Sequence, residues 1–341
     1  MKRNKFLDWM AYLGLRVVVA LIQATSLENC QRAARVAAHS LAHWIPLRRK
    51  TIDQNLAMVI PQITPRQLDD LREAMWEHLL LMICEIAHAP RKIHRTNWRD
   101  HFFIPQKRAI FRVLMGERPT ILVTGHFGNF ELAGFATGLF GIPSTTIARP
   151  LDNPYVNQYI NHFRSLGGQH MLDKAGSAAP VQAILESGGA LALLADQHAG
   201  AKGCWTEFLG QPASCHKALA LFVLTSNAAM VVSYNRRLKR PLQFEMGTTG
   251  IAHPDSPGDH LASVKALTLW YNQCLERAIR PAPQQYWWVH RRWREPPPKV
   301  RSAAQPGFST LPSGVTGSVT GAVPNTASNG LPLNVPPSTD L

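Results

Sequence analysis

From residue 119 onward, short apolar runs alternate with helix-like segments, and this alternation restricts the possible folds more than any other feature of the chain. The apolar runs have the length of strands buried on both faces, and they span residues 121–124, 145–148, 191–195 and 230–233. The segments between them carry helix start and stop signals, and they cover residues 153–167, 179–187 and 216–226. The pattern predicts a largely parallel sheet flanked by helices, with ligands near the carboxyl ends of the strands.

A longer helix is predicted upstream. Thr64 suits the N-cap, Pro65 the first helical position and Gln67 the third, and apolar residues then recur at helical spacing. The pattern predicts an amphipathic helix that ends at Pro90.

A single histidine follows the first apolar run, in the block Gly-His-Phe-Gly-Asn-Phe-Glu over residues 125–131. Histidine accepts a proton near neutral pH, and a nearby carboxylate can hold its imidazole in one tautomer. On one regular helix His126 and Glu131 would point well apart, so they meet only if the chain bends, which Gly125 and Gly128 permit. The block predicts His126 as a general base with Glu131 as its partner. The same residues also suit a loop histidine bound to the backbone and a solvated glutamate in a first helical turn.

The N-terminal region predicts a membrane anchor. An apolar stretch over residues 6–22 follows three cations and is broken only by Asp8 and Arg16. A cleaved signal peptide is disfavoured because no small-x-small site follows cleanly and residues 27–44 continue as an amphipathic helix. We therefore expect residues 1–45 to anchor the chain, either as a tilted span or as an interfacial helix, with a buried core helix as the third alternative.

The C-terminal region has a different composition. Pro, Ser, Thr, Gly and Asn dominate from Pro296 onward, and charges nearly vanish after Arg301. Such a segment cannot bury enough apolar surface to offset its ordering entropy. We expect a disordered tail over residues 298–341, preceded by one α/β domain over residues 46–297.

The formal net charge of +14 points to an anionic partner, which could be an anionic lipid, an acidic protein or a nucleic acid. Nucleic acid is the weakest of the three, because the sequence has no zinc-finger spacing, RNA-binding aromatic signature or basic zipper. The five cysteines are few, odd in number and widely spread, which suits reduced thiols in a cytoplasmic compartment.

Metal and serine chemistry are both disfavoured. The block at 125–131 is not a His-Glu-x-x-His arrangement, and the histidines and cysteines between 198 and 216 lack the paired short spacing of a structural zinc site. A Gly-x-Ser-x-Gly nucleophile elbow is also absent from the sequence. We expect no metal, and direct transfer rather than a covalent serine intermediate.

The block at 125–131 resembles the His-x-x-x-x-Glu block of the bacterial lipid A biosynthesis acyltransferases, the lauroyl and myristoyl transferases, which are relatives of the glycerolipid acyltransferases. Further landmarks follow in the order of that family: Asn55-Leu56 with Ile60-Pro61, Arg149-Pro150 with Asn153-Pro154, Arg164 with Gly167, Ala195-Asp196-Gln197, Phe208 to Ala213, and His290-Arg291-Arg292-Trp293. The resemblance extends from the N-terminal apolar helix to about Pro297. One departure is the segment 214–217, Ser-Cys-His-Lys, where the family has small and hydroxyl residues with a glycine.

The resemblance implies a glycerolipid-acyltransferase-like fold and a membrane-associated O-acyltransferase. Such enzymes take a fatty acyl chain from acyl carrier protein and place it on a hydroxyl of a lipid A precursor, at the cytoplasmic side of the inner membrane. The thioester is already activated, so no cofactor is expected. An acidic carrier and a phosphorylated glycolipid would both be attracted by the basic patches.

The resemblance also implies roles for individual residues. His126 would be the base and Glu131 its orienting partner, while Arg164 and Asp196 would support substrate binding and charge stabilisation. Asn129 would cap the following helix, and amides of its turn could serve as oxyanion donors. Further candidates for contact with phosphate or anionic headgroups are Arg149, Gln197, His290, Arg291 and Arg292. Seen alone, each residue also suits a structural role, such as a surface cation or a turn aspartate.

Two other functions are compatible with the same residues. The acceptor could be another glycolipid or a phospholipid, since the same base suits any such hydroxyl. The protein could also be a catalytically silent membrane-binding protein that retained the fold, although an intact His126, Glu131 and Asp196 argue against it.

Overall fold

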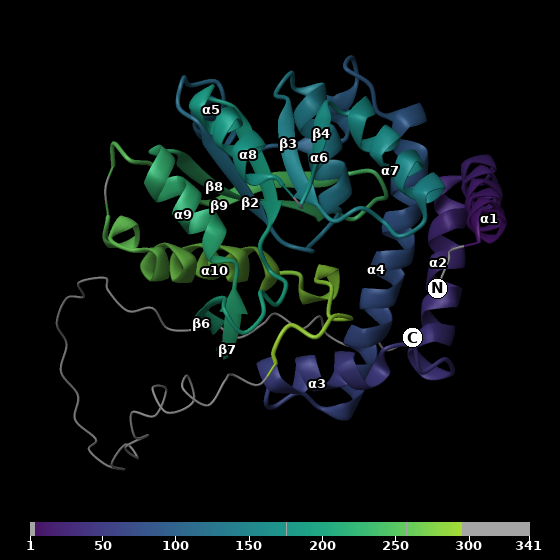
Figure 1. The fold of residues 1–341 in the computed structure, drawn as a ribbon. Helices are drawn as coiled ribbons and strands as arrows, with labels where there is room; N and C mark the ends of the chain where they lie inside the picture. The colour runs from purple at the N-terminus through teal and green to yellow at the C-terminus, as the bar shows by residue number, and fades with distance from the viewer. Residues whose placement is uncertain (1–3, 175, 257, 295–341) are drawn as a thin grey trace, which may run out of the picture.

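A seven-stranded sheet forms the centre of the protein in a computed structural model that describes residues 4–174, 176–256 and 258–294 (Figure 1). Its strand order is β1-β9-β8-β2-β5-β3-β4. The strands are β1 (Phe102–Phe103), β2 (Thr120–Thr124), β3 (Ser144–Ala148), β4 (Gln169–Asp173), β5 (Ala190–Leu194), β8 (Ala229–Arg237) and β9 (Phe244–Ala252). Every neighbouring pair is parallel except β8 with β9, so the predicted largely parallel sheet is confirmed.

Helices cover both faces of this sheet: α5 (Lys107–Leu114), α6 (Phe130–Leu139), α7 (Pro154–Leu166), α8 (Ala178–Glu186), α9 (Lys217–Ser226) and α10 (Val264–Ile279). Alternation along β2 assigns the faces. Ile121 and Val123 belong to the larger core with residues of α8, α9 and α10, whereas Leu122 and Thr124 face α5 and α6. The central strands are therefore covered on both sides, which explains their continuous apolar runs.

The N-terminal helices form a separate layer: α1 (Lys5–Ala24), α2 (Leu27–His43), α3 (Arg49–Val59) and α4 (Pro65–Lys92). A stripe of small residues, including Ala34, Ala38 and Ala42, packs α2 along α4. Helix α1 has no buried residue and lies against α4 and α7, and its length and hydropathy are sufficient to cross a membrane. Both predicted N-terminal helices are confirmed.

Helix α4 begins with the predicted capping box at Thr64 but continues through Pro90 to Lys92, so its predicted end is wrong. The proline removes only one amide donor in the last turn, and the amide of Ile93 still donates to the carbonyl of Ala89. A proline this close to a helix end therefore does not stop the helix.

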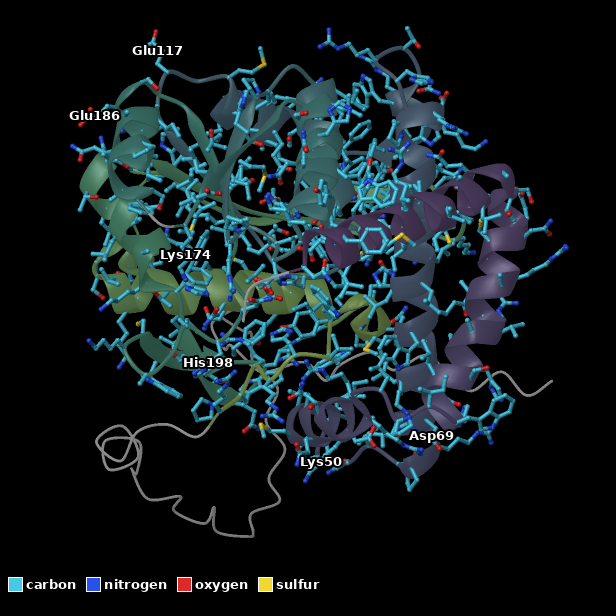
Figure 2. The ribbon with its side chains drawn as sticks, turned by 45° about the vertical axis from the view of Figure 1, so that its right-hand side comes forward. Lys50, Asp69, Glu117, Lys174, Glu186 and His198 are labelled. Atoms are coloured by element: carbon cyan, nitrogen blue, oxygen red, sulfur yellow. The ribbon has the colours of Figure 1, made fainter. Side chains whose placement is uncertain are left out.

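The remaining elements are a hairpin of β6 (Cys204–Phe208) and β7 (Gln211–Cys215) and the short helices η1 (Trp98–Asp100), η2 (Asp259–Leu261) and η3 (Pro283–Gln285). Figure 2 shows Glu117 and Glu186, which precede β2 and β5, at one end of the molecule, and His198, which follows β5, toward the other end. The carboxyl ends of the central strands therefore point toward the β6-β7 hairpin. The predicted tail lies outside the described residues, and the predicted domain division stays a prediction.

Candidate active site

His126 and Asp196 form a buried hydrogen-bonded pair beyond the carboxyl ends of β2 and β5. His126 Nδ1 lies 2.8 Å from Asp196 Oδ1, and the backbone amide of His126 donates to Asp196 Oδ2 at 2.8 Å. Asp196 is fully buried, while the His126 side chain is 10% exposed. Burial by itself would raise the pKa of the Asp196 carboxyl, but the attraction and hydrogen bonds of His126, together with the charge of His290, hold that pKa well below its usual value. The ionised carboxylate therefore keeps a proton on Nδ1 and leaves Nε2 as the basic nitrogen.

Strand register explains why these two residues meet. Thr124 pairs with Leu194 in the parallel ladder of β2 and β5, and the amide of Ala195 donates to the carbonyl of Thr124 at 2.8 Å. His126 and Asp196 each follow their paired strand residue by two positions. Gly125 allows the close approach, because a Cβ at this position would lie 3.1 Å from Asp196 Oδ2.

Polar and aromatic side chains surround the basic nitrogen of His126. Gln197 Nε2 lies 3.2 Å from His126 Nε2, and the rings of Phe130 and Trp287 pack at 5.0 and 4.8 Å from the imidazole centroid. His290 sits 6.0 Å away, with Nε2 3.4 Å from the carbonyl of Asp196. Because its amide can donate to Nε2, Gln197 supports the same tautomer as Asp196 does.

Glu131 does not contact His126, so the predicted orienting contact is wrong. Its carboxylate forms a bidentate pair with Arg164 of α7, with Oε1 2.6 Å from Nη2 and Oε2 3.0 Å from Nε. The chain does bend at Gly128, as predicted, but the bend directs Glu131 toward α7. Burial would lower the pKa of Arg164, but the hydrogen bond and charge of Glu131 raise it. Asp196, which was expected to support substrate binding and charge stabilisation, contacts the histidine itself.

The turn between His126 and α6 is held from several sides. Gly128 has a φ of 61°, and a Cβ there would lie 2.0 Å from the carbonyl oxygen of Asn235. The amides of Gly128 and Asn129 donate to the carbonyls of Gln285 and Asn235 at 2.9 Å each. These two amides and that of His126 are therefore bonded inside the protein and are not free to act as oxyanion donors. For the other amides of the turn the expectation stays a prediction. The predicted cap is confirmed, since the Asn129 side chain accepts from the amide of Leu132.

A buried charged network that the sequence analysis did not identify supports this turn. Glu85 of α4 is fully buried and accepts from Arg237 Nε at 2.6 Å and from Asn129 Nδ2 at 2.9 Å. Arg237 also lies 2.7 Å from Nδ1 of His78, whose Nε2 is 3.3 Å from the carbonyl of Gly128. Burial, and then the charge of Arg237, lower the pKa of His78 well below its usual value. One ion pair and one neutral histidine thus link α4 and β8 to the turn after His126.

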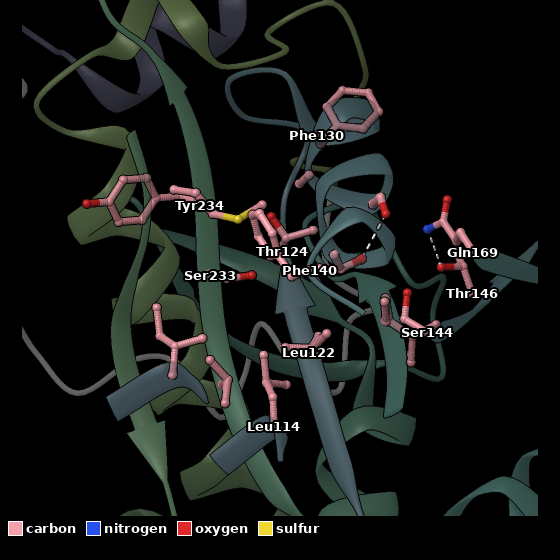
Figure 3. Close-up of a pocket in the computed structure, with 18 of the residues that line it drawn as sticks. Leu114, Leu122, Thr124, Phe130, Phe140, Ser144, Thr146, Gln169, Ser233 and Tyr234 are labelled. Carbon is pink, nitrogen blue, oxygen red and sulfur yellow. Dashed lines mark hydrogen bonds between the residues drawn. The ribbon is translucent and has the colours of Figure 1, made fainter. Parts of the chain in front are cut away.

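An apolar cavity begins at Phe130 and extends between the sheet and helices α5 and α6 (Figure 3). It has a volume of about 90 Å³, and its lining is mostly apolar. Phe130 lies at one end, next to His126, and Leu114 of α5 lies at the opposite end, with Leu122 between them. A mostly apolar cavity that starts beside His126 suits a hydrocarbon chain.

The predicted headgroup contacts have mixed outcomes. Arg292 is 1% exposed, donates to the carbonyl of Ser214 and to Cys215 Sγ, and packs over the ring of Phe208, so the prediction that it faces headgroups is wrong. His290 is half-buried beside the His126–Asp196 dyad, and its contact with headgroups stays a prediction. Arg291 and Arg149 are exposed, and Arg149 pairs with Asp152 at 3.2 Å. Their substrate contacts stay predictions.

Within the described residues, one group of three side chains could hold a metal ion, formed by His39 and His43 of α2 and Glu73 of α4. Glu73 Oε2 lies 3.1 Å from His39 Nδ1 and 2.9 Å from His43 Nε2. None of these three residues is among the side chains that surround His126. The expectation that the chemistry needs no metal stays a prediction.

Comparison with known proteins identifies the family. The bacterial lipid A biosynthesis acyltransferase family matches residues 2–295. Similar proteins include the lipid A biosynthesis lauroyltransferase of Escherichia coli (strain K12), 23% identical over 300 residues that cover 86% of this chain and 94% of the relative. The palmitoleoyltransferase of the same organism is 24% identical over 298 residues, which cover 85% and 92%. A lipid A biosynthesis acyltransferase of Shigella flexneri has the same identity and coverage. The chain therefore belongs to the bacterial lipid A biosynthesis acyltransferases and is a transferase.

Proposed function

We propose that this protein transfers a fatty acyl chain from acyl carrier protein to a hydroxyl of a lipid A precursor, at the cytoplasmic face of the inner membrane. The observation that carries the proposal is the His126–Asp196 pair, whose imidazole packs against Phe130, a residue that also lines an apolar cavity. A base and an adjacent hydrocarbon site are the two features that acyl transfer to a hydroxyl requires.

In the proposed mechanism, His126 Nε2 takes the proton of the acceptor hydroxyl as its oxygen attacks the thioester carbonyl. Asp196 stabilises the imidazolium that forms and holds the ring in place. When the tetrahedral intermediate collapses, the carbon–sulfur bond breaks and the imidazolium returns its proton to the thiolate of the carrier. The products are an oxygen ester and a free carrier thiol, and the thioester supplies all the activation that the step needs.

Arg164 would bind the developing negative charge or a substrate anion. The bidentate contact with Glu131 fixes its guanidinium and leaves the remaining donors for a ligand. The two residues are 20–21% exposed, so the pair is accessible from solvent. In this proposal Glu131 is a positioning residue that acts through Arg164.

The donor and the membrane would be recognised by separate features. The apolar cavity would hold the acyl chain of the donor, and the net charge of +14 would attract an acidic carrier and an anionic lipid surface. Helix α1, apolar and without buried residues, would hold the site at the bilayer.

The test is transfer by the purified full-length chain. Radiolabelled acyl carrier protein is mixed with a lipid A precursor, with another glycolipid or with a lysophospholipid, and the lipid products are identified by mass spectrometry. We expect transfer to the lipid A precursor, and loss of transfer in a folded His126→Ala variant. Wild-type-like transfer by that variant would refute the assigned base. Transfer to another glycolipid or to a lysophospholipid, without transfer to the lipid A precursor, would show that the proposed acceptor is wrong. Binding to liposomes without any transfer would favour a catalytically silent protein.

A further inference from the structure

An open groove lies between α1 and α7. One stretch of about 510 Å³ is lined by Tyr12, Arg16, Tyr155, Gln158, Tyr159 and His162. A second stretch of about 320 Å³ shares three of these residues and continues to the last turn of α4, where it reaches Arg91. Figure 1 shows α1 beside α7 along this side of the molecule. The side chain of Asn153 closes one end of the groove by donating to the carbonyl of Asp8 at 2.7 Å.

The groove is cationic. It contains Arg16 from α1, Arg91 from α4 and His162 from α7, and none of the residues lining either stretch is acidic. The guanidinium of Arg16 lies 5.2 Å from the ring centroid of Tyr159, and its Nη1 donates to the hydroxyl of Tyr12 at 2.8 Å. Two turns separate Arg16 from Asp8 on α1, or about 12 Å along the axis. Aromatic rings rather than a carboxylate therefore hold this arginine in place.

Such a charge is costly in an apolar helix near a bilayer unless an anion accompanies it. Arg16 interrupts the apolar surface of α1, and its ring contacts direct it toward α7 rather than toward lipid. Arginine donors match the oxygens of phosphate in charge and geometry, and tyrosines are enriched at the headgroup level of membranes. An anionic lipid group would therefore complement the positive charge of Arg16 and Arg91 in this groove.

We propose that the groove between α1 and α7 binds a phosphate group of the lipid acceptor, an inference that rests on the proposed function. Arg164 follows His162 by two positions, which places it on the other side of α7, where it pairs with Glu131. The thickness of one helix, about 10 Å, therefore separates the groove from the Arg164–Glu131 pair. A phosphorylated glycolipid bound across α7 could place a hydroxyl near His126 while its phosphate stays in the groove.

The experiment measures binding and catalysis separately on the full-length protein. Equilibrium binding of the phosphorylated lipid A precursor and of its enzymatically dephosphorylated form is measured in the same neutral detergent, for wild type, Arg16→Gln and Arg91→Gln. Arg32→Gln is the matched control, because it removes one exposed positive charge from α2 outside the groove. KM and kcat for both acceptors are then measured at saturating donor.

We expect each groove variant to weaken binding of the phosphorylated precursor, and to raise its KM, about tenfold, as for the loss of one charge-assisted hydrogen bond. The dephosphorylated precursor should bind all four proteins equally, and kcat should stay within about twofold of wild type because the dyad is untouched. If Arg16→Gln and Arg91→Gln bind the phosphorylated precursor as tightly as Arg32→Gln does, the inference is wrong. Displacement of the precursor by equimolar phosphatidylglycerol would overturn the acceptor assignment in favour of bulk membrane lipid. If wild type binds the precursor through the groove but transfers no acyl chain, the proposed function fails and the phosphate site stands.

Discussion

Replacing Asp196 with Asn tests the dyad directly, because the amide cannot reproduce both contacts of the carboxylate. One oxygen of Asp196 accepts from the backbone amide of His126 and the other from Nδ1. Asparagine has one acceptor and one donor at its end. If its oxygen keeps the backbone amide, its NH₂ group faces Nδ1, and the imidazole must then carry its proton on Nε2. The variant should therefore hold His126 in the tautomer that cannot accept a proton.

The size of the effect follows from the role assigned to His126. General base catalysis contributes about 10²- to 10⁴-fold, so Asp196→Asn should lower kcat by that factor, or by about 3–5 kcal/mol in transition-state free energy. The residue is buried and isosteric with its replacement, so the fold should persist, which thermal unfolding of the variant would verify. The assay is steady-state transfer of a labelled acyl chain across a pH series.

Glu131→Gln provides the contrast, because Glu131 contacts Arg164 rather than the imidazole. This variant should lower the rate while keeping the pH dependence of kcat/KM that wild type shows, whereas Asp196→Asn should lose that dependence. A rate for Asp196→Asn within tenfold of wild type would refute the assigned dyad. So would a pH profile altered by Glu131→Gln and unaltered by Asp196→Asn.

Three further outcomes are expected. Gly128→Ala should abolish transfer and destabilise the fold by several kcal/mol, because its Cβ would lie 2.0 Å from the carbonyl oxygen of Asn235. In the control Gly141→Ala, φ is also positive but no atom lies within 4 Å, so the loss of stability measured by urea unfolding should be about 1 kcal/mol. Ala192→Leu narrows the apolar cavity, so competition between donors of different chain length should shift toward shorter chains, and an unchanged preference would argue against the cavity as the acyl site. Acidification from pH 7 to pH 5 should lower the free energy of unfolding. Burial lowers the pKa of His78, so this side chain stays neutral in the folded protein, whereas in the unfolded chain it takes up a proton below about pH 6.5. The urea midpoint should therefore depend less on pH in His78→Gln.

Periodicity identified the elements whose residues are buried on a full face. The strands predicted at 121–124 and 191–195 occur at Thr120–Thr124 and Ala190–Leu194, and the helix predicted at 216–226 occurs at Lys217–Ser226. Five strands were not identified, among them β4 and β9. The first is a polar edge strand, Gln-His-Met-Leu-Asp, and the second contains two glycines and two threonines, so neither has the apolar run that indicates a buried strand.

The sequence indicated His126 as a candidate base, but it did not indicate the residue that the imidazole contacts. His126 follows an apolar strand and lies beside glycines, which are local signals. Asp196 is 70 residues away, and its contact with His126 depends on β2 and β5 being neighbours. Several strand orders are compatible with the same pattern of strands and helices, and only one places these two strand ends together. Glu131 was the candidate partner of His126 because it is close in sequence, but the turn after His126 directs its side chain toward Arg164 of α7. Glu85 and Arg237 were missed for the same reason, since they lie 152 residues apart.

The paired strands of the dyad have a consequence for protein engineering. His126 and Asp196 each lie two residues beyond Thr124 and Leu194, which are paired in the parallel sheet. The Asp196 carboxylate accepts a hydrogen bond from the backbone amide of His126, just past the end of the paired strands. The reacting geometry is thus an extension of the sheet rather than a property of its long loops. A designer could transplant it into another parallel sheet by keeping two neighbouring strands in register and adding Gly-His after one and Ala-Asp after the other. The helices that are proposed to contact the donor and the acceptor could then be exchanged as separate modules around an unchanged His–Asp pair.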